Sequence, residues 1–175
     1  MNEAILIQKC IQLGAYKAAC ANVSDITFDP NLRKACEANY CGNYGKNLTC
    51  PPAVGTPEEL IARAKSYSRI LVFQTVTPLE DSFDFEGMNE AKAKHCELSS
   101  EIDKLIDVPH LQLAAGGCTV CERCAGFDGE PCRYPDRAVA SLEAYCINVS
   151  KLAALCGMKY INGVDTVTFF TGYLY

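Results

Sequence analysis

The chain contains 175 residues, of which 49% are hydrophobic and 21% are charged, and this composition is usual for a globular domain and argues against a disordered or fibrous protein. Lysines and arginines total 16 against 21 aspartates and glutamates, so the formal net charge is -5. A surface that binds nucleic acid normally needs clustered basic residues, and we therefore expect no nucleic-acid partner.

Cysteine content is the most unusual feature of the sequence, with 12 cysteines in 175 residues. The first residues include acidic and polar side chains and no small-residue cleavage site, so they do not resemble a signal peptide. Apolar runs are far shorter than the roughly 20 residues that span a bilayer, which predicts no membrane partner. We expect a cytoplasmic protein, where thiols stay reduced and cysteine clusters usually bind metals or perform redox chemistry.

The N-terminal part of the chain combines two predicted helices with a short strand and a loop. Residues 2–19 mix isoleucine and leucine with glutamate, glutamine and lysine at spacings that predict an amphipathic helix. A short strand is predicted over residues 22–28, and Pro30 opens a short helix that ends near residue 38. Residues 39–55 contain three glycines and two adjacent prolines and have no regular period, which predicts a structured loop.

The middle of the chain has the clearest patterns. Thr56 and Pro57 are typical of a helix N-cap and first helical position, and they predict a helix that extends to about residue 67. Residues 69–77 are too apolar to have one face in water, which predicts a central strand. From residue 85 to residue 106, apolar side chains recur three and four positions apart, as in one long helix.

The C-terminal part completes an alternation of strands and helices. Its predicted elements are a strand at 111–115, a glycine- and cysteine-rich loop at 116–135, helices at 136–145 and 148–156, and a strand at 165–174. No composition shift or linker marks a domain boundary. We therefore predict a single α/β domain over residues 1–175, a layered sandwich in which helices cover a small sheet and two cysteine-rich loops bind metal.

The strongest motif lies in the second of these loops. Two residues separate Cys118 from Cys121 and Cys121 from Cys124, and seven residues separate Cys124 from Cys132. Closely spaced thiolates of this kind favour a 4Fe-4S cluster at these four cysteines, which we call the 118–132 thiols. Zinc is the alternative, although zinc sites more often use two separated C-x2-C pairs. Cys132 does not directly precede a proline, unlike the last cysteine of the bacterial ferredoxin motif, so a role at another centre stays open.

A second set of cysteines lies in and just before the first loop. Cys36, Cys41 and Cys50, which we call the 36–50 thiols, are separated by four and eight residues. Three ligands do not complete a cubane, so either one iron is open to a small substrate or to sulfide, or a fourth ligand comes from elsewhere. The candidates for this fourth ligand are Cys146, Cys20, Cys96 and His95. Three structural cysteines in a glycine-rich loop are the alternative to a second cluster.

Several polar residues near these cysteines have two interpretations. Lys46, Arg123 and Arg133 are adjacent to candidate ligands, where they can tune the charge of a bound centre or simply be solvated. His95 lies on the apolar stripe of the predicted long helix. A buried and hydrogen-bonded core histidine is therefore the simpler interpretation of His95 than a metal ligand.

The two cysteine loops and the closing strand resemble a known family. The segments CGNYGKNLTCPP, GGCTVCERCAGFDGEPCRYP and VTFFTGYLY are similar to a family of predicted metal-binding proteins, and the resemblance covers about residues 36–175. Members are small cysteine-rich proteins of unknown function, mostly from anaerobic prokaryotes. The resemblance implies that both loops are metal sites. The family commonly has glycine at the position of Cys146, where this chain departs from the pattern.

These features predict an iron-sulfur protein of an anaerobe that transfers single electrons or supports a redox reaction. Its cofactors would be one or two 4Fe-4S clusters, and its partner a redox protein or a small molecule. The sequence contains no dinucleotide-binding, P-loop, zinc-protease or nucleophile-elbow motif. Two alternatives stay open: an enzyme that offers an open iron to a small substrate or to sulfide, and a zinc-stapled structural or interaction protein.

Overall fold

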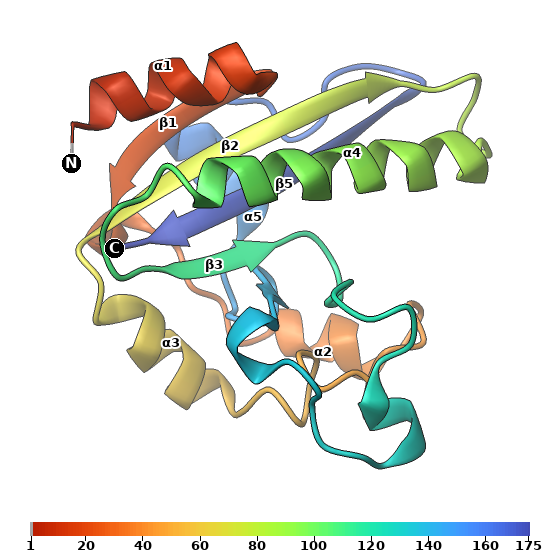
Figure 1. Cartoon of the computed structure of the whole chain (residues 1–175). Helices are drawn as coiled ribbons and strands as arrows, with labels where there is room; N and C mark the ends of the chain where they lie inside the picture. The colour runs from red at the N-terminus through yellow and green to blue at the C-terminus, as the bar shows by residue number, and fades with distance from the viewer. Residues whose placement is uncertain (1) are drawn as a thin grey trace.

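One five-stranded sheet organises the chain, in the strand order β1-β2-β5-β3-β4 (Figure 1). The computed structural model describes residues 2–175. Its strands are β1 (Lys17–Asn22), β2 (Arg69–Pro78), β3 (Leu111–Ala114), β4 (Ala140–Ser141) and β5 (Thr166–Leu174). Neighbouring strands are antiparallel except for β3 and β4, which run parallel to each other.

Helices cover both faces of this sheet. They are α1 (Glu3–Leu13), α2 (Leu32–Glu37), α3 (Pro57–Lys65), α4 (Phe85–Asp103) and α5 (Val149–Leu155). α1 and α4 lie on one face of the sheet, whereas α3 and α5 lie on the other (Figure 1). The predicted single α/β domain with a small sheet between helices is therefore confirmed.

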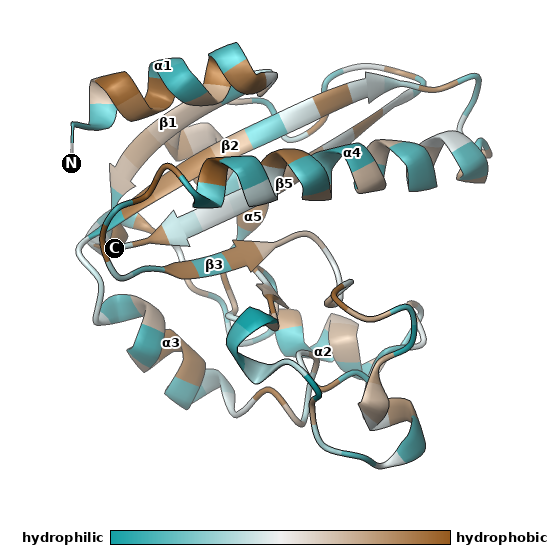
Figure 2. Cartoon of the chain, viewed as in Figure 1, coloured by the Kyte–Doolittle hydropathy of each residue, from teal (hydrophilic) through white to brown (hydrophobic). Residues whose placement is uncertain are grey.

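Two apolar clusters, one on each face of the sheet, hold these layers together. On the side of α1 and α4, Leu6 and Ile102 belong to a cluster with Phe73 of β2. The opposite cluster is larger and includes Leu60 of α3 and Leu152 of α5. Figure 2 shows hydrophobic residues along β3 and the first half of β2, and β2 contributes side chains to both clusters. Burial of this apolar surface is the main favourable term for folding.

The central strand is β2, as predicted. It pairs with β1 along one edge and with β5 along the other. Leu71 and Phe73 face the α1 and α4 side, while Ile70 and Val72 face the opposite side, and all four are fully buried. A strand buried on both faces has a continuous apolar sequence, which is why this element was predictable from composition.

The predicted N-terminal helix over residues 2–19 is wrong at its C-terminal end. α1 ends just before Gly14, which takes a left-handed φ of 117° and whose backbone N–H caps the last turn. Residues 17–22 instead form β1, whose backbone pairs with that of β2. The alanines of this segment are compatible with either structure, so the open edge of β2 decides the outcome.

The strand predicted over residues 22–28 is also wrong. Val23–Asp25 forms a single 3-10 turn after β1, and Phe28 contributes only an isolated bridge to Ile147. The apolar residues Val23 and Ile26 are buried, as in a strand, but they enter the core from a turn.

A third correction concerns the helix predicted over residues 136–145. This segment begins with a 3-10 turn at Pro135–Arg137 and continues into the short strand β4. Tight turns follow, in which the backbone N–H groups of Tyr145 and Ile147 both donate to the carbonyl of Leu142. Apolar side chains at helical spacing are buried here, but the parallel pairing of β4 with β3 replaces the helix.

The other predicted elements are present with shifted ends. α2, α3, α4, α5, β3 and β5 fall within the predicted segments or within one residue of them, and both cysteine-rich segments are loops apart from short 3-10 turns. Thr56 caps α3 as predicted, since its side chain accepts from the backbone N–H of Glu59. In residues 2–175, no helix is both long enough and apolar enough to cross a membrane.

Candidate metal centre

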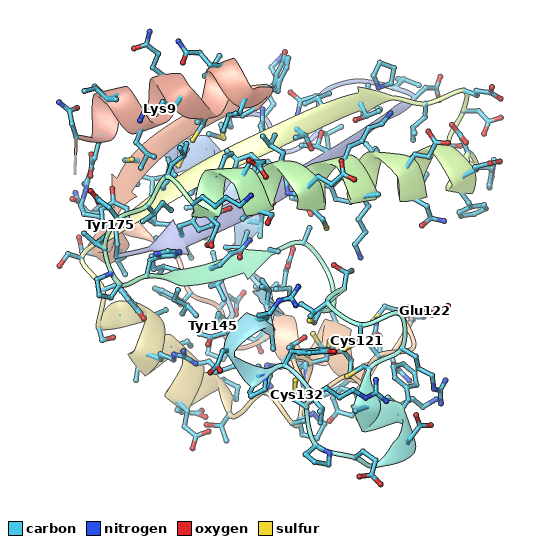
Figure 3. The ribbon with its side chains drawn as sticks, viewed as in Figure 1. Lys9, Cys121, Glu122, Cys132, Tyr145 and Tyr175 are labelled. Carbon is cyan, nitrogen blue, oxygen red and sulfur yellow. The ribbon has the colours of Figure 1, made fainter. Side chains whose placement is uncertain are left out.

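The 118–132 thiols line one cavity. Cys118, Cys121, Cys124 and Cys132 all contribute to its wall, together with Leu48 and Thr49 of the first loop. The labelled side chains of Cys121 and Cys132 lie in the lower lobe of the molecule, where the two loops meet (Figure 3). Each of the four thiols is only partly exposed. The chain therefore brings together all four cysteines of the strongest sequence motif.

The first loop forms part of this cavity wall through two hydrogen bonds. The backbone N–H of Leu48 donates to the sulfur of Cys124 at 3.5 Å, and the backbone N–H of Cys118 donates to the hydroxyl of Thr49 at 3.2 Å. The buried amide of Asn47 holds this wall in place, because its oxygen accepts from both the N–H and the hydroxyl of Thr49. An N–H directed at a ligand sulfur is one of the contacts that tune a thiolate-bound metal.

Close approach of the two loops depends on Gly126. A Cβ at this position would overlap the carbonyl oxygen of Lys46 and crowd the side chain of Leu48. Residues 46–48 thus lie directly against the 3-10 turn that follows Cys124. Because these two segments are far apart in sequence, the cysteine spacing within each loop could not predict that the loops are in contact.

Basic side chains border the 118–132 thiols on their outer side. Arg123 forms an exposed ion pair with Asp128 at 2.9 Å, and this pairing lowers the pKa of the Asp128 carboxyl. Arg123 and Lys46 both lie over the ring of Phe127, at 5.1 Å and 5.8 Å from its centroid. Arg133 donates to the backbone carbonyl of Arg123. The three basic residues singled out in the sequence therefore lie in one region beside the cavity.

The 36–50 thiols also lie close to one another. Burial and the neighbouring charges of Cys41 and Cys36 together raise the pKa of the Cys50 thiol to about 11. Cys36 is at the last turn of α2, whereas Cys41 is exposed in the loop. The N–H of Gly45 donates to the carbonyl of Pro51 at 2.8 Å, which folds the loop back next to Cys50. Left-handed φ values at Gly42 and Gly45 allow these turns.

The two thiol sets are adjacent. Cys124 is among the groups whose charge raises the pKa of Cys50. Leu48 and Thr49, which contact Cys124 and Cys118, directly precede Cys50 in the chain. Residues 48–50 therefore contact the 118–132 thiols and also contain one of the 36–50 thiols.

The four candidates for a further ligand of the 36–50 thiols lie in different places. Cys146 is fully buried and close enough to Cys36 to raise the pKa of that thiol. Cys20 lies on β1, where it accepts from the hydroxyl of Tyr175 at 3.5 Å. Cys96 lies on α4, where it contacts the hydroxyl of Thr119 at 3.8 Å, next to the 118–132 thiols. The structure thus brings only Cys146 next to the 36–50 thiols.

The fourth candidate, His95, is a buried core histidine. Its Nδ1 is 2.8 Å from the Thr75 hydroxyl and its Nε2 is 2.9 Å from the Thr171 hydroxyl. The ring also stacks on Phe73 of β2, on the sheet face covered by α1 and α4. Burial lowers the pKa of His95 to about 4, so the ring is neutral near neutral pH. Both ring nitrogens are occupied by hydroxyl groups, and His95 is not positioned to bind a metal.

The donor set of both loops consists of thiols. All twelve cysteines are free, and thiolates are the ligands of iron-sulfur clusters and of structural zinc. Within residues 2–175, no three cysteine, histidine or acidic side chains are already close enough together to hold one metal ion.

Sequence reasoning missed two residues of this region. Arg33 of α2 is buried next to Cys36, three residues away on the same helical face. Glu143 is also close to Cys36, and burial raises the pKa of its carboxyl. The helical spacing of Arg33 and Cys36 is a signal that could have been used, whereas nothing in the sequence links Glu143 to Cys36.

A comparison with known protein families matches residues 20–175 to a family described as predicted metal-binding proteins (DUF2284). The chain belongs to this family. The match begins before Cys36 and includes all seven cysteines of the two thiol sets, together with Cys146. Searches of curated proteins and of solved structures found no match. Membership in this family of predicted metal-binding proteins agrees with the resemblance of the two loops, and it does not specify the metal.

Proposed function

We propose that this protein binds a 4Fe-4S cluster at the 118–132 thiols and transfers single electrons. The observation that supports this most strongly is the shared cavity of Cys118, Cys121, Cys124 and Cys132. Their two-residue spacings suit a cluster better than a single zinc ion, whose sites usually use two separated pairs. The N–H of Leu48, which points at the sulfur of Cys124, suits a ligand that carries negative charge.

The chain's own residues would set the properties of such a centre. The four thiols would hold the cluster as thiolates, and a bound cluster would supply one-electron redox chemistry. Leu48 and Val120 border the cavity and limit the access of water. Arg123 and Arg133 lie beside the 118–132 thiols and would favour the reduced, more negative state. Their exposed charges also offer a docking point for an acidic region of a redox partner.

A second cluster at the 36–50 thiols is part of the same proposal. Cys36, Cys41 and Cys50 lie near one another, and Cys50 is also near Cys124. Two neighbouring clusters would give an electron a short path between the two cysteine-rich loops. The alternatives are a cluster with an open iron that acts on a small substrate or sulfide, and a zinc-stapled structural protein.

Metal analysis of the anaerobically purified full chain tests this proposal. About eight iron and eight sulfide per chain, with visible and EPR spectra that respond to dithionite, would support two cubanes. Zinc without sulfide would refute the redox function and favour the structural alternative. Conversion of a small substrate by the iron-loaded protein, or uptake of sulfide, would favour the enzyme.

Matched variants assign the cluster to its loop. Cys124→Ala should lose about half of the iron and sulfide, because it removes a thiol from the 118–132 set. Cys156→Ala is the control, since Cys156 is a cysteine at the end of α5 that packs against the core. Equal iron content in the two variants would exclude the 118–132 thiols as ligands.

A further inference from the structure

Arg33 is a buried cation of α2. Its side chain has an exposed fraction of only 8%. Nη2 donates to the carbonyl of Ala144 at 2.9 Å, whereas Nε has no hydrogen-bond partner in the described part of the chain. Among the ion pairs formed within residues 2–175, none includes Arg33. Burial of a guanidinium without a compensating charge is costly, so this position calls for a negative group.

Two thiols lie near Arg33, and the Glu143 carboxyl, whose pKa is raised by burial, lies near one of them. Cys36 lies one turn further along α2, on the same helical face. Cys146 follows two residues after Ala144, whose carbonyl Arg33 binds, so the Cys146 thiol lies near the Arg33 guanidinium. Burial raises the pKa of both thiols, and the positive charge of Arg33 opposes that rise. Arg33 therefore lies beside both thiols.

Cys146 occupies a position that suits glycine better than cysteine. Its φ is 58°, in the left-handed region, and its side chain is fully buried. The surrounding turn holds this conformation, because the N–H of Asp29 donates to the Cys146 carbonyl at 2.7 Å and the N–H of Cys146 donates to Glu143. A strained non-glycine residue at a buried position is a reason to look for a function of its side chain.

We propose that Cys146 is the fourth ligand of a second iron-sulfur centre, which it forms with the 36–50 thiols. The buried guanidinium of Arg33 balances the negative charge of this centre. On binding iron, each of the four thiols releases its proton to solvent and forms one iron–sulfur bond. This inference rests on the proposed function, namely that the cysteine loops hold iron-sulfur clusters. It replaces the open iron with a fully ligated centre suited to electron transfer.

Cys146→Gly tests the ligand. The left-handed φ of this position favours glycine, so the substitution removes the thiol without adding backbone strain. We expect the anaerobically purified variant to lose about half of its iron and sulfide, or to retain a three-iron centre, while the EPR signal of the 118–132 centre persists. Cys36→Ala should give the same pattern, and Cys156→Ala should not change the wild-type content.

The outcomes separate this inference from the proposed function. Wild-type iron and sulfide content in Cys146→Gly would overturn the inference and leave the proposed function intact. A loss of iron in Cys36→Ala but not in Cys146→Gly would restore the open-iron alternative and also overturn it. Zinc without sulfide in the wild-type protein would refute both.

Arg33→Met and Arg33→Lys test the counter-charge. Loss of a nearby positive charge disfavours the reduced centre, so Arg33→Met should shift the reduction potential of the second centre to a more negative value. Arg33→Lys keeps the charge and should restore most of the potential. A purely structural role of Arg33 would change stability in both variants without this difference in potential. Equal potentials in wild type and in iron-loaded Arg33→Met would overturn the role assigned to Arg33.

Discussion

His95 and Arg33 are both buried polar side chains, but one lies against the sheet and the other beside the cysteine loops. Both ring nitrogens of His95 lie at hydrogen-bond distance from threonine hydroxyls, and Ser99 completes the network by donating to the His95 carbonyl. Arg33 has a hydrogen-bond partner for Nη2, but among residues 2–175 it has none for Nε. His95 on the sheet thus has partners for both of its ring nitrogens, while Arg33 beside the loops carries a charge that a metal centre would balance.

Removal of metal should have the largest effect and should separate the two regions. Metal binding to thiolate sites contributes on the order of 10 kcal/mol to folding in small metal-dependent domains. We expect an anaerobic chelator to accelerate hydrogen exchange in residues 39–55 and 116–135, while amides of β2 and β5 stay protected. Hydrogen-exchange mass spectrometry of the loaded and the stripped protein measures this. Equal loss of protection in β2 and β5 would show that the two regions unfold as one unit.

The pH dependence of the free energy of unfolding should report the burial of His95 on the sheet side. Burial lowers the pKa of His95 to about 4 from an ordinary value of 6.5, so the unfolded chain binds this proton first as the pH falls. Stability should therefore decrease by about 1.4 kcal/mol per pH unit between pH 6.5 and pH 4. Urea unfolding of wild type and His95→Gln at pH 7 and pH 5 isolates the effect, which we expect to be about 2 kcal/mol.

His95→Gln is the informative control in this series, because glutamine keeps hydrogen-bonding capacity near Thr75 and Thr171 but does not titrate in this range. The same pH dependence in wild type and variant would assign the loss of stability to other groups, such as the metal ligands.

Gln74 of the sheet differs from His95, because it is a buried polar side chain without hydrogen-bond partners among the described residues. It is fully buried in β2, and neither its amide nitrogen nor its amide oxygen has a partner within the described residues 2–175. Gln74→Met removes both groups at similar volume, so we expect the free energy of unfolding to rise by about 1 to 2 kcal/mol. Urea unfolding measures it, and the iron content should stay unchanged. A loss of stability or of iron would mean that the amide has a partner in the loaded protein.

The smallest expected effect concerns the boundary between the first loop and α3. Thr56 caps this helix through the backbone N–H of Glu59 at 3.3 Å. Thr56→Ala should lower the free energy of unfolding by about 1 kcal/mol, because it leaves an N–H of the first turn without its partner. Thr56→Ser keeps the hydroxyl and should retain most of that stability. Metal loss in Thr56→Ala but not in Thr56→Ser would show that the cap also holds the metal loop.

The sequence predicted those elements whose local sequence pattern favours the same structure as their tertiary contacts. β2 is continuously apolar, and α3 has a strong start signal at Thr56 and Pro57, so both were predictable. Residues 17–22 and 136–145 were not, because pairing with distant strands overrides their local helical pattern. For elements of this kind, local propensity is only a weak guide.

The same distinction applies to the candidate site. The spacing of Cys118, Cys121 and Cys124 indicated a common centre, because neighbours in one loop must lie close together. Cys146 could be named only as one of four options, since its position next to Cys36 depends on how a turn after β4 packs against α2. Arg33 was missed for the same reason, because its burial is a property of the folded chain.

The parallel pairing of β3 with β4 has a consequence for chain connectivity. Parallel neighbours cannot be joined by a tight turn and need a crossover of a dozen or more residues, which in most proteins is a helix that packs on the sheet. Here the crossover is the segment between Ala114 and Ala140, and it contains all of the 118–132 thiols. A bound centre would therefore fix the conformation of this connection, as packing of an apolar helix face on the sheet does in most crossovers.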